Sequence, residues 1–345
     1  MTSQHQTAQK TADVLNQLEP VARSYVQRLL QQNGTPISQM PVDQARAYMR
    51  GNQRTPMEHP SVEVKSTEMA TVRVRVVRPA GRDGDLPVVL YLHGGGWVLG
   101  APETHGRIVQ KLACMADANI IVPDYALAPE NPYPAALDQC YAIAQQISTA
   151  RPGSGLDSRR LAVAGDSAGG NLAAALALRA VHQGDVQFRL QALLCPAVQA
   201  YSTTGSYRSF GTALNLTADT MQWFWQAYVP DKTLWNQPAV SPLKATRESL
   251  ARVAPAWIVT AGCDVLRDEA EQYGERLVAA GNPATVLRCM ATIHNFLIID
   301  DLDQSGPAIA ATAALGKALW NALHTPADGF NAAQHENERN AQAWP

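Results

Sequence analysis

The sequence predicts an α/β fold in which a mostly parallel sheet of eight strands is flanked by helices. Five apolar runs, VVLYL, NIIVP, LAVAG, ALLCP and AWIVTAG, lack polar alternation, as expected of strands that helices cover on both faces. Helical segments separate these runs, which indicates right-handed βαβ crossovers. The length of 345 residues, with 46% hydrophobic and 17% charged residues, is sufficient for a large core. The expected strands cover residues 62–66, 71–78, 87–92, 119–123, 160–164, 190–195, 255–261 and 284–290.

Two helices are expected in an N-terminal segment of residues 1–55. Apolar side chains recur at helical spacing over residues 11–32, and the following Gly34 and Pro36 are typical of a helix end. A second, shorter helix is expected over residues 42–50.

The rest of the chain divides into a large domain of residues 56–325 and a tail of residues 326–345. Inside the domain, residues 198–250 interrupt the alternation of strands and helices and are rich in Ser, Thr and aromatic side chains. We expect this segment to be an insertion that lies over the strand ends, partnered by the N-terminal helices. The tail is polar and is expected to fray.

Charge and hydropathy exclude several classes of protein. The net charge is −2 and no run of Lys or Arg exceeds two residues, so nucleic-acid binding is not expected. No apolar stretch approaches the ~18 residues of a membrane span. The N-terminus lacks the layout of a signal peptide, which predicts a cytoplasmic protein without stable membrane association. The cysteines lack metal-ligand spacing and are expected to be buried hydrophobes rather than disulfides or metal ligands: Cys114, Cys140, Cys195, Cys263 and Cys289.

A nucleophilic serine is predicted at Ser167. The segment from Leu161 to Asn171 combines an apolar strand, the pattern G-x-S-x-G and the start of an Ala/Leu-rich helix. A nucleophile elbow requires this strand–turn–helix context, because glycines on both sides let the strand and the helix approach closely. The hydroxyl would then project above the sheet at a helix N-terminus, where the dipole favours negative charge. A glycine-rich turn without a catalytic role is the alternative.

The serine needs a base and an acid, and both are predicted at the ends of later strands. Asp264 follows the expected strand at 255–261, and His294 follows the strand at 284–290. Their order after Ser167 is the order found in α/β-hydrolases, and the carboxyl ends of parallel strands share one edge of the sheet. We therefore expect these three residues to form a catalytic triad.

Other acids and histidines are weaker candidates for the triad. Asp268 lies one helical turn beyond Asp264 and is expected to cap a helix or pair with a neighbour, and Asp166 is expected to point away from the serine. His93 and His105 precede the serine, which is the wrong order for the base. His93 is expected instead to brace a nearby glycine loop through hydrogen bonds to the backbone. The remaining histidines lie in polar or terminal segments or end a helix: His5, His59, His182, His324 and His335.

The glycine loop at residues 93–97, with the sequence HGGGW, is predicted to form an oxyanion hole. Acyl transfer develops negative charge on a carbonyl oxygen, and preorganised amide N–H groups stabilise that charge. The expected donors are the amides of Gly95, Gly96 and Ala168. Gly94 is a further candidate. Glycines leave these amides uncovered by side chains, which accounts for three of them in a row.

These motifs together resemble the hormone-sensitive-lipase-like family of α/β-hydrolases, the bacterial family IV carboxylesterases. The similarity extends from about residue 60 to residue 320 and includes, in order, HGGGW at 93–97, DYALAPENPYPAA at 124–136, GDSAGGN at 165–171, SPL at 241–243, the acid motif at 264–269 and His294. The resemblance implies an α/β-hydrolase fold with a helical cap built from residues 1–55 and 198–250. It also implies hydrolysis of short- to medium-chain acyl esters, no cofactor, and frequent homodimers.

Three positions depart from the family pattern. Val265 stands where the family has Pro, Ala126 where it has Arg, and Asn295 where it has Gly. Asn tolerates positive φ better than most non-glycine residues, so a tight turn after His294 can be retained. The alternative is that the Asn295 side chain holds the histidine loop or binds substrate.

The sequence therefore predicts a serine carboxylesterase whose partner is a small-molecule ester. Aromatic residues of the insertion and of the glycine loop are candidates for the substrate pocket, with packing inside the cap as the alternative: Trp97, Trp223, Phe224, Trp225 and Tyr228. A lipase, an amidase or a lactonase would use the same triad. A non-catalytic small-molecule receptor on the same fold is a further alternative, because fold alone does not fix function.

Overall fold

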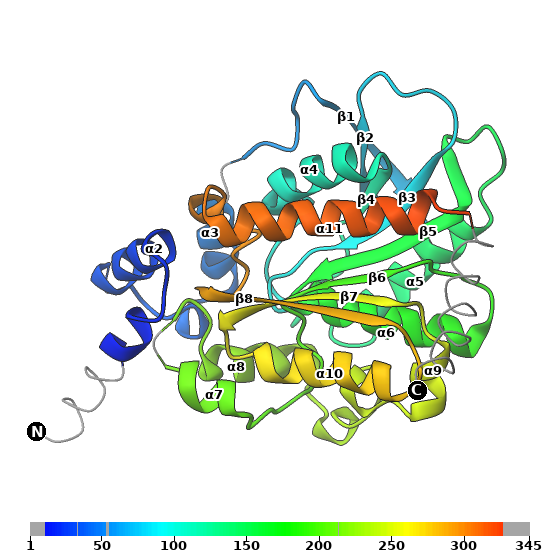
Figure 1. Cartoon of the computed structure of the whole chain (residues 1–345). Coiled ribbons are helices and arrows are strands. Elements are labelled where there is room, and N and C mark those ends of the chain that lie inside the picture. Colours follow the sequence, from blue (N-terminus) through cyan, green and yellow to red (C-terminus); the bar gives the residue numbers. More distant parts are fainter. Residues whose placement is uncertain (1–10, 33, 53–54, 213, 327–345) are drawn as a thin grey trace, which may run out of the picture.

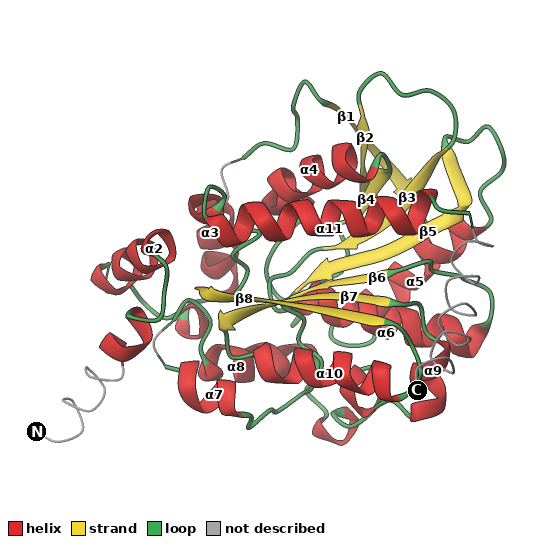
Figure 2. Ribbon diagram, in the orientation of Figure 1, coloured by secondary structure: helices red, strands yellow, loops and turns green. Residues whose placement is uncertain are grey.

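The computed structural model contains one eight-stranded sheet between two layers of helices (Figure 1, Figure 2). It describes residues 11–32, 34–52, 55–212 and 214–326. The strands are β1 Val62–Met69, β2 Val72–Pro79, β3 Leu86–Leu92, β4 Asn119–Pro123, β5 Leu156–Asp166, β6 Gln191–Leu194, β7 Ala256–Cys263 and β8 Ala284–Ile293.

The order of the strands in the sheet is β1-β2-β4-β3-β5-β6-β7-β8. β2 is antiparallel to both β1 and β4. All other neighbours, from β4 to β8, are parallel. The predicted eight-stranded, mostly parallel sheet is therefore confirmed, and the carboxyl ends of β3, β5, β7 and β8 lie along one edge.

Helices cover both faces of the sheet and also surround this edge. The helices are α2 Pro20–Gln31, α3 Val42–Asn52, α4 Gly106–Ala116, α5 Ala135–Ser148, α6 Ala168–Gln183, α7 Gly205–Phe210, α8 Ala218–Tyr228, α9 Arg247–Arg252, α10 Arg267–Ala279 and α11 Gly306–His324. α4 and α11 pack together on one face, and α6 and α10 cover the other (Figure 1). α2, α3 and α8 lie at the carboxyl ends of the central strands and cover the loops that follow them (Figure 1).

Capping side chains set where several of these helices begin. Ser305 accepts a hydrogen bond from the Ala308 amide at the start of α11, and Thr217 accepts one from the Thr220 amide at the start of α8. Both capping residues have the extended backbone that is typical of N-caps. Gly184 ends α6 in the left-handed region with a φ of 73°. Local sequence is therefore sufficient to fix these boundaries.

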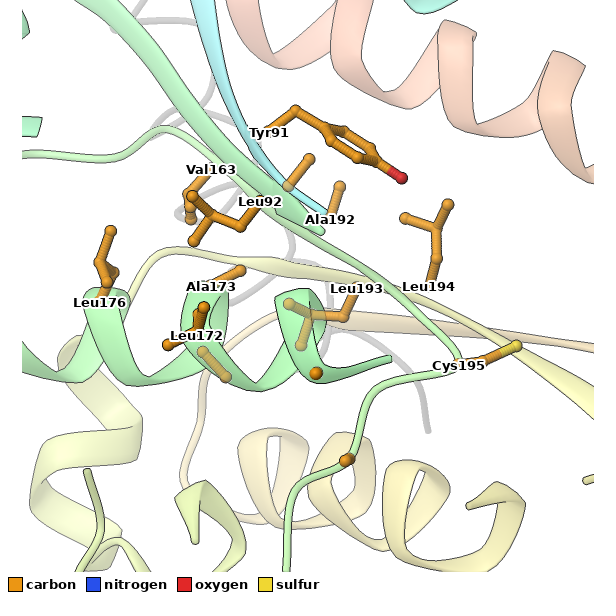
Figure 3. Packing of buried hydrophobic residues seen from close by; sticks show 14 of the residues in the cluster. Tyr91, Leu92, Val163, Leu172, Ala173, Leu176, Ala192, Leu193, Leu194 and Cys195 are labelled. Carbon is orange, nitrogen blue, oxygen red and sulfur yellow. The ribbon is translucent and has the colours of Figure 1, made fainter. Parts of the chain in front are cut away.

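Apolar packing holds α6 against the central strands. Leu172, Ala173 and Leu176 of α6 face the strands, whereas Tyr91 of β3 points to the opposite side of the sheet (Figure 3). All four side chains are completely buried. Complete burial of a leucine side chain stabilises the fold by about 1.5–3 kcal/mol. This layer therefore also holds the turn that joins β5 to α6.

The structure corrects several boundaries predicted from the sequence, including the ends of β1 and β8, which extend to Met69 and Ile293. The helix expected over residues 11–32 is broken, because residues 11–15 are helical, a turn follows, and α2 begins at Pro20. Proline lacks an amide hydrogen, so the first turn of a helix tolerates it and the interior does not. Glu19 caps the new helix by accepting hydrogen bonds from two amides of its first turn. β5 also begins earlier than expected, at Leu156.

The predicted insertion of residues 198–250 has two parts. α8 contacts the 3-10 helix Ile37–Gln39 of the N-terminal segment, near the strand ends. The later part, with the 3-10 helix Pro242–Lys244 and α9, packs against α6 and α10. This packing puts α9 in the helical layer of the sheet rather than over the strand ends. The tail predicted over residues 326–345 lies almost entirely outside the described residues.

No helix in the described ranges combines the length and the apolar character that crossing a membrane requires. All five cysteines are free thiols. The prediction that they are buried is confirmed for Cys140, Cys195 and Cys263, whereas Cys289 is half-buried and Cys114 is exposed.

Candidate active site

Ser167 occupies a strained turn between β5 and α6. Its φ is 55° and its ψ is −117°, a conformation that non-glycine residues rarely adopt. A Cβ atom on Gly165 would overlap the backbone of Gly169, and a Cβ atom on Gly169 would overlap the Leu92 carbonyl. The strand and the helix therefore approach as closely as a nucleophile elbow requires. This turn holds the serine at the N-terminus of α6.

The three residues predicted as a triad lie together. His294 Nε2 is 3.0 Å from Ser167 Oγ, and His294 Nδ1 is 2.7 Å from Asp264 Oδ2. All three side chains are buried. The other carboxylate oxygen of Asp264 accepts a hydrogen bond from the Leu266 amide at 3.0 Å, which fixes the orientation of the carboxylate. This geometry suits a serine activated by an imidazole base that a carboxylate orients.

Asp268, the rival acid, anchors α7 instead of the histidine. One of its oxygens accepts a hydrogen bond from the Ser206 amide at 2.7 Å, and the other pairs with Arg267. Burial alone would raise the pKa of Asp268, but the Ser206 amide and the Arg267 guanidinium lower it below the ordinary value. The carboxylate is therefore ionised and committed to these two partners.

Two asparagines hold the loop that carries His294. Asn295 has a φ of 55°, as the sequence predicted, and its Nδ2 donates to Asp166 Oδ2 at 3.2 Å. Asn215, in the segment before α8, donates its Nδ2 to the His294 carbonyl at 3.0 Å. No sequence motif marks Asn215, because its contact depends on how the insertion folds over the strand ends.

The glycine loop brings two backbone amides to the site. Gly95 and Gly96 have φ values of 117° and 62°, and both line the same cavity as Ser167. A Cβ atom on Gly96 would overlap the ring of Phe224, so no larger residue fits there. Among the described residues, the amides of Gly95, Gly96 and Ala168 have no hydrogen-bond acceptor. They remain the candidate oxyanion donors.

Asp166 holds this loop from behind. It is completely buried, and its Oδ1 accepts hydrogen bonds from the Gly94 amide at 3.0 Å and the Tyr91 hydroxyl at 2.9 Å. Burial would raise the pKa of Asp166, but the nearby His105 and the Tyr91 hydroxyl lower it. The Gly94 amide is committed to this carboxylate, which removes Gly94 from the candidate oxyanion donors. The signal in the sequence is an acid directly before the elbow serine.

His93 lies against the same loop. Its Nδ1 is 2.9 Å from the Gly94 carbonyl, and its ring stacks on Tyr125 with 4.2 Å between centroids. The Tyr125 hydroxyl donates to the His93 carbonyl at 2.7 Å. Burial, followed by the proximity of His105, lowers the pKa of His93 to about 4. The ring is therefore neutral at pH 7, and its contacts are those expected of a residue that braces the loop.

A cavity of about 190 Å³ lies over Ser167. The loops that carry Ser167 and His294 form its floor. The N-terminal helices form a wall whose residues were not predicted from the sequence. Tyr25 and Leu29 of α2 and Tyr48 of α3 all line it. α8 faces it from the other side through Thr220 and Phe224. Apolar side chains make up most of the lining, which suits an acyl chain or an apolar alcohol.

Of the five aromatic residues predicted for the pocket, only Phe224 lines this cavity. Trp97 is completely buried and stacks on Tyr228 at 4.5 Å between centroids, with Trp225 at 4.3 Å. Trp223 packs beside Phe224 at 4.9 Å but does not reach the cavity. The structure therefore assigns Trp223, Trp225 and Tyr228 to packing, because only one face of α8 turns toward the serine, and it assigns Trp97 of the glycine loop to packing against that helix.

One group of possible metal ligands includes the triad acid and base. Cys195 Sγ and ligand atoms of Asp264 and His294 lie within 4.8 Å of one another. The histidine and the carboxylate are already hydrogen-bonded to each other. Burial, and then the charge of Asp264, raises the pKa of the Cys195 thiol well above its ordinary value, which disfavours the thiolate that a metal requires. The donor set fits a metal poorly.

Comparison with known proteins identifies the family. A family model described as the alpha/beta hydrolase fold matches residues 89–298. The chain belongs to the α/β-hydrolase family. It is 35% identical to the esterase LipI of Mycobacterium tuberculosis over 81% of this chain and 87% of that protein. It is 33% identical to the carboxylesterase NlhH of the same organism over 82% of this chain and 90% of that one. The crystal structure of a thermostable esterase from Pseudomonas putida superposes with a TM-score of 0.86 at 37% identity, covering 90% of this chain and 98% of the esterase.

Proposed function

We propose that this α/β-hydrolase is a serine carboxylesterase that hydrolyses short- to medium-chain acyl esters through an acyl-enzyme intermediate. The observation that carries the proposal is the continuous hydrogen-bonded chain from Ser167 through His294 to Asp264 at the floor of an apolar cavity. Similarity to proteins named as esterases over most of their length supports the same activity. The hormone-sensitive-lipase-like branch of the family is the best match for the motifs.

In the first half of the reaction, Ser167 Oγ attacks the ester carbonyl while its proton passes to His294 Nε2. The carbonyl oxygen becomes negatively charged, and the amides of Gly95, Gly96 and Ala168 stabilise it. Asp264 keeps Nδ1 protonated and stabilises the imidazolium that forms. His294 then gives its proton to the alcohol oxygen as the bond from carbonyl carbon to that oxygen breaks. The alcohol leaves, and the acyl group remains on the serine.

In the second half, water takes the place of the alcohol. His294 Nε2 accepts a proton from the water as its oxygen attacks the acyl carbonyl, and the same amides stabilise the second tetrahedral intermediate. The proton then returns to Ser167 Oγ as the acyl–oxygen bond breaks. The carboxylic acid is released, and the enzyme regains its starting state without a metal or an organic cofactor in any step.

The enclosing helices limit the size of the substrate. We propose that α2, α3 and α8 form a cap over the catalytic loops, since the walls of the cavity come from these three helices. Phe224 packs directly on Gly96, so it borders the space next to the scissile carbonyl. A bulky or very long acyl chain would have to displace this ring, which favours short and medium chains.

A panel of nitrophenyl esters from acetate to palmitate tests the proposal. We expect rapid hydrolysis of short and medium chains, an initial burst of nitrophenol equal to the enzyme concentration for a slowly deacylating ester, and no activity in Ser167→Ala. A sharp increase in rate when the substrate forms droplets would identify a lipase instead. Binding of esters without turnover would identify a receptor.

A further inference from the structure

We propose that Asn295 is a positioning residue that couples the base loop to the oxyanion loop through the carboxylate of Asp166. The inference rests on the proposed ester hydrolysis by Ser167 and His294. It concerns a position where this chain departs from the glycine of the family it resembles, so the side chain is a feature of this chain.

The carboxylate of Asp166 is the junction of the network. Its Oδ1 accepts the Gly94 amide at 3.0 Å and the Tyr91 hydroxyl at 2.9 Å, and its Oδ2 accepts Asn295 Nδ2 at 3.2 Å. The buried His105 also contacts the carboxylate, with Nε2 3.2 Å from Oδ1 and 3.4 Å from Oδ2. A Cβ atom on Gly94 would overlap this carboxylate, so the glycine allows the close approach. An ionised, fully buried carboxylate is a strong acceptor that needs several donors. The contacts with Gly94, Tyr91 and His105 hold the carboxylate in place, and the Asn295 amide joins it to the loop that carries His294. Removal of the Asn295 amide therefore breaks this link between the two loops.

The turn at Asn295 does not itself require the amide side chain. The Asn295 carbonyl accepts hydrogen bonds from the Ile298 amide at 2.8 Å and the Ile299 amide at 3.0 Å, so the backbone closes the turn. A φ of 55° is equally accessible to glycine. Asparagine adds a donor, Nδ2, which glycine lacks. At position 295, asparagine therefore differs from glycine by its hydrogen bond to Asp166.

The proposed nucleophile, the proposed base and one proposed oxyanion donor are each one residue away from the network. Ser167 follows Asp166, the Gly95 amide follows Gly94, and His294 precedes Asn295. A shift of the Asn295 side chain would therefore change the relative position of the base and the oxyanion donors. Transition-state stabilisation is sensitive to such shifts, because its donors must lie 2.7–3.1 Å from a defined oxygen position. Ground-state binding in the apolar cavity rests on non-directional contacts and is far less sensitive.

Asn295→Gly tests the role of the side chain, because it retains the left-handed turn and removes the donor. We expect kcat for nitrophenyl butyrate to fall tenfold or more, KM to change less than twofold, and the melting temperature to change by only a few degrees. The matched control is Asp117→Gly, at a left-handed position with a φ of 46° whose carboxylate pairs with Arg82 on the surface. We expect unchanged kcat in that variant.

An exchange of the two side chains tests the partner. Asn295→Asp alone would oppose two buried carboxylates and should lower kcat more than Asn295→Gly does. Adding Asp166→Asn restores one amide and one carboxylate at the contact, and we expect at least a tenfold recovery of kcat relative to Asn295→Asp. If the double variant does not fold, its melting curve shows it, and the Asn295→Gly result decides alone.

Three results overturn the inference while leaving the proposed function intact: kcat within twofold in Asn295→Gly, a change confined to KM, or full activity in Asn295→Asp. A parent enzyme that does not hydrolyse nitrophenyl esters would instead refute the proposed function itself. The two failures are therefore separate observations on the same proteins.

Discussion

The loops that follow β5, β7 and β8 carry side chains whose positions must be exact, whereas α8, the helix that covers these loops, carries side chains that mainly fill space. In the proposed mechanism Ser167 must contact His294 to pass it a proton, and Asp264 must contact His294 to orient it; the two contacts are 3.0 and 2.7 Å. The aromatic residues of α8 need only fill space. Phe224 lines the cavity, whereas Trp225, one position later, packs in the interior. Motif and chain order therefore locate reacting groups, but the side chains of a cavity wall depend on which helix face turns inward.

Ser167→Ala should produce the largest effect on activity. Loss of the nucleophile should lower ester turnover by about 10⁴-fold or more, as in other triad enzymes. The melting temperature should not fall, because the strained turn loses only a hydroxyl. Turnover of nitrophenyl butyrate and thermal unfolding of the same preparation check both statements. Substantial residual activity would place the nucleophile elsewhere.

The two carboxylates near β7 should differ by orders of magnitude. Asp264→Asn keeps the shape but removes the charge that orients and stabilises the imidazolium, and kcat should fall by about 10³–10⁴-fold. Asp268→Asn is the matched control, since that residue serves the Ser206 amide and Arg267, and kcat should change less than threefold. Measurement of kcat for both variants at one pH is sufficient. A reversed ranking would refute the assignment of the acid.

Adjacent residues of α8 provide a test of the cavity wall. Phe224→Ala should shift the preferred acyl length toward longer chains, because the ring borders the cavity beside Gly96. Trp225→Ala should leave the preference unchanged and should lower the free energy of unfolding by about 3–5 kcal/mol, since it removes a buried aromatic side chain. Rates across the ester panel and denaturant unfolding separate the two effects. Equal shifts in preference would mean that both residues line the site.

Glu269 should produce the smallest effect on activity, because its role is visible mainly in stability. Its carboxylate is buried and accepts the Val198 amide at 3.0 Å, and burial raises its pKa from 4.5 to about 8. Between these values the unfolded state releases the proton while the folded state retains it, so the folded state loses relative stability as pH rises from about 4.5 to about 8. The Glu269→Gln variant has no carboxyl group at this position, so its stability should not fall in this way as pH rises.

The difference in melting temperature between Glu269→Gln and the parent should therefore increase across that pH range and then level off. Its size corresponds to a free energy of the order of a few kcal/mol. Melting curves at about pH 5, 6.5, 8 and 9 check the trend, because these values span the range between the two pKa values of Glu269. A difference that is independent of pH would contradict the raised pKa.

Most of the fold, and the contact among Ser167, His294 and Asp264, could be predicted from local features of the sequence. Apolar runs and helical spacing depend on short segments, and the elbow at Ser167 combines strand, turn and helix within a few residues. The break before Pro20 was missed because the apolar spacing continues across it. Asn215 could not be predicted, because its contact joins the insertion to a loop that is distant in the sequence. The bond between Asp166 and Gly94 also joins segments that are distant in the sequence, although the position of Asp166 directly before Ser167 marks the acid itself.

Mass spectrometry after reaction with an organophosphate tests the central claim most directly. We predict a single phosphoryl adduct on Ser167, formed in step with the loss of esterase activity, and absent from Ser167→Ala. His294→Ala should retain the serine and react far more slowly, because the base that activates it is missing. An adduct on another residue that accompanies inactivation, or full activity while Ser167 is completely labelled, would contradict the proposed site.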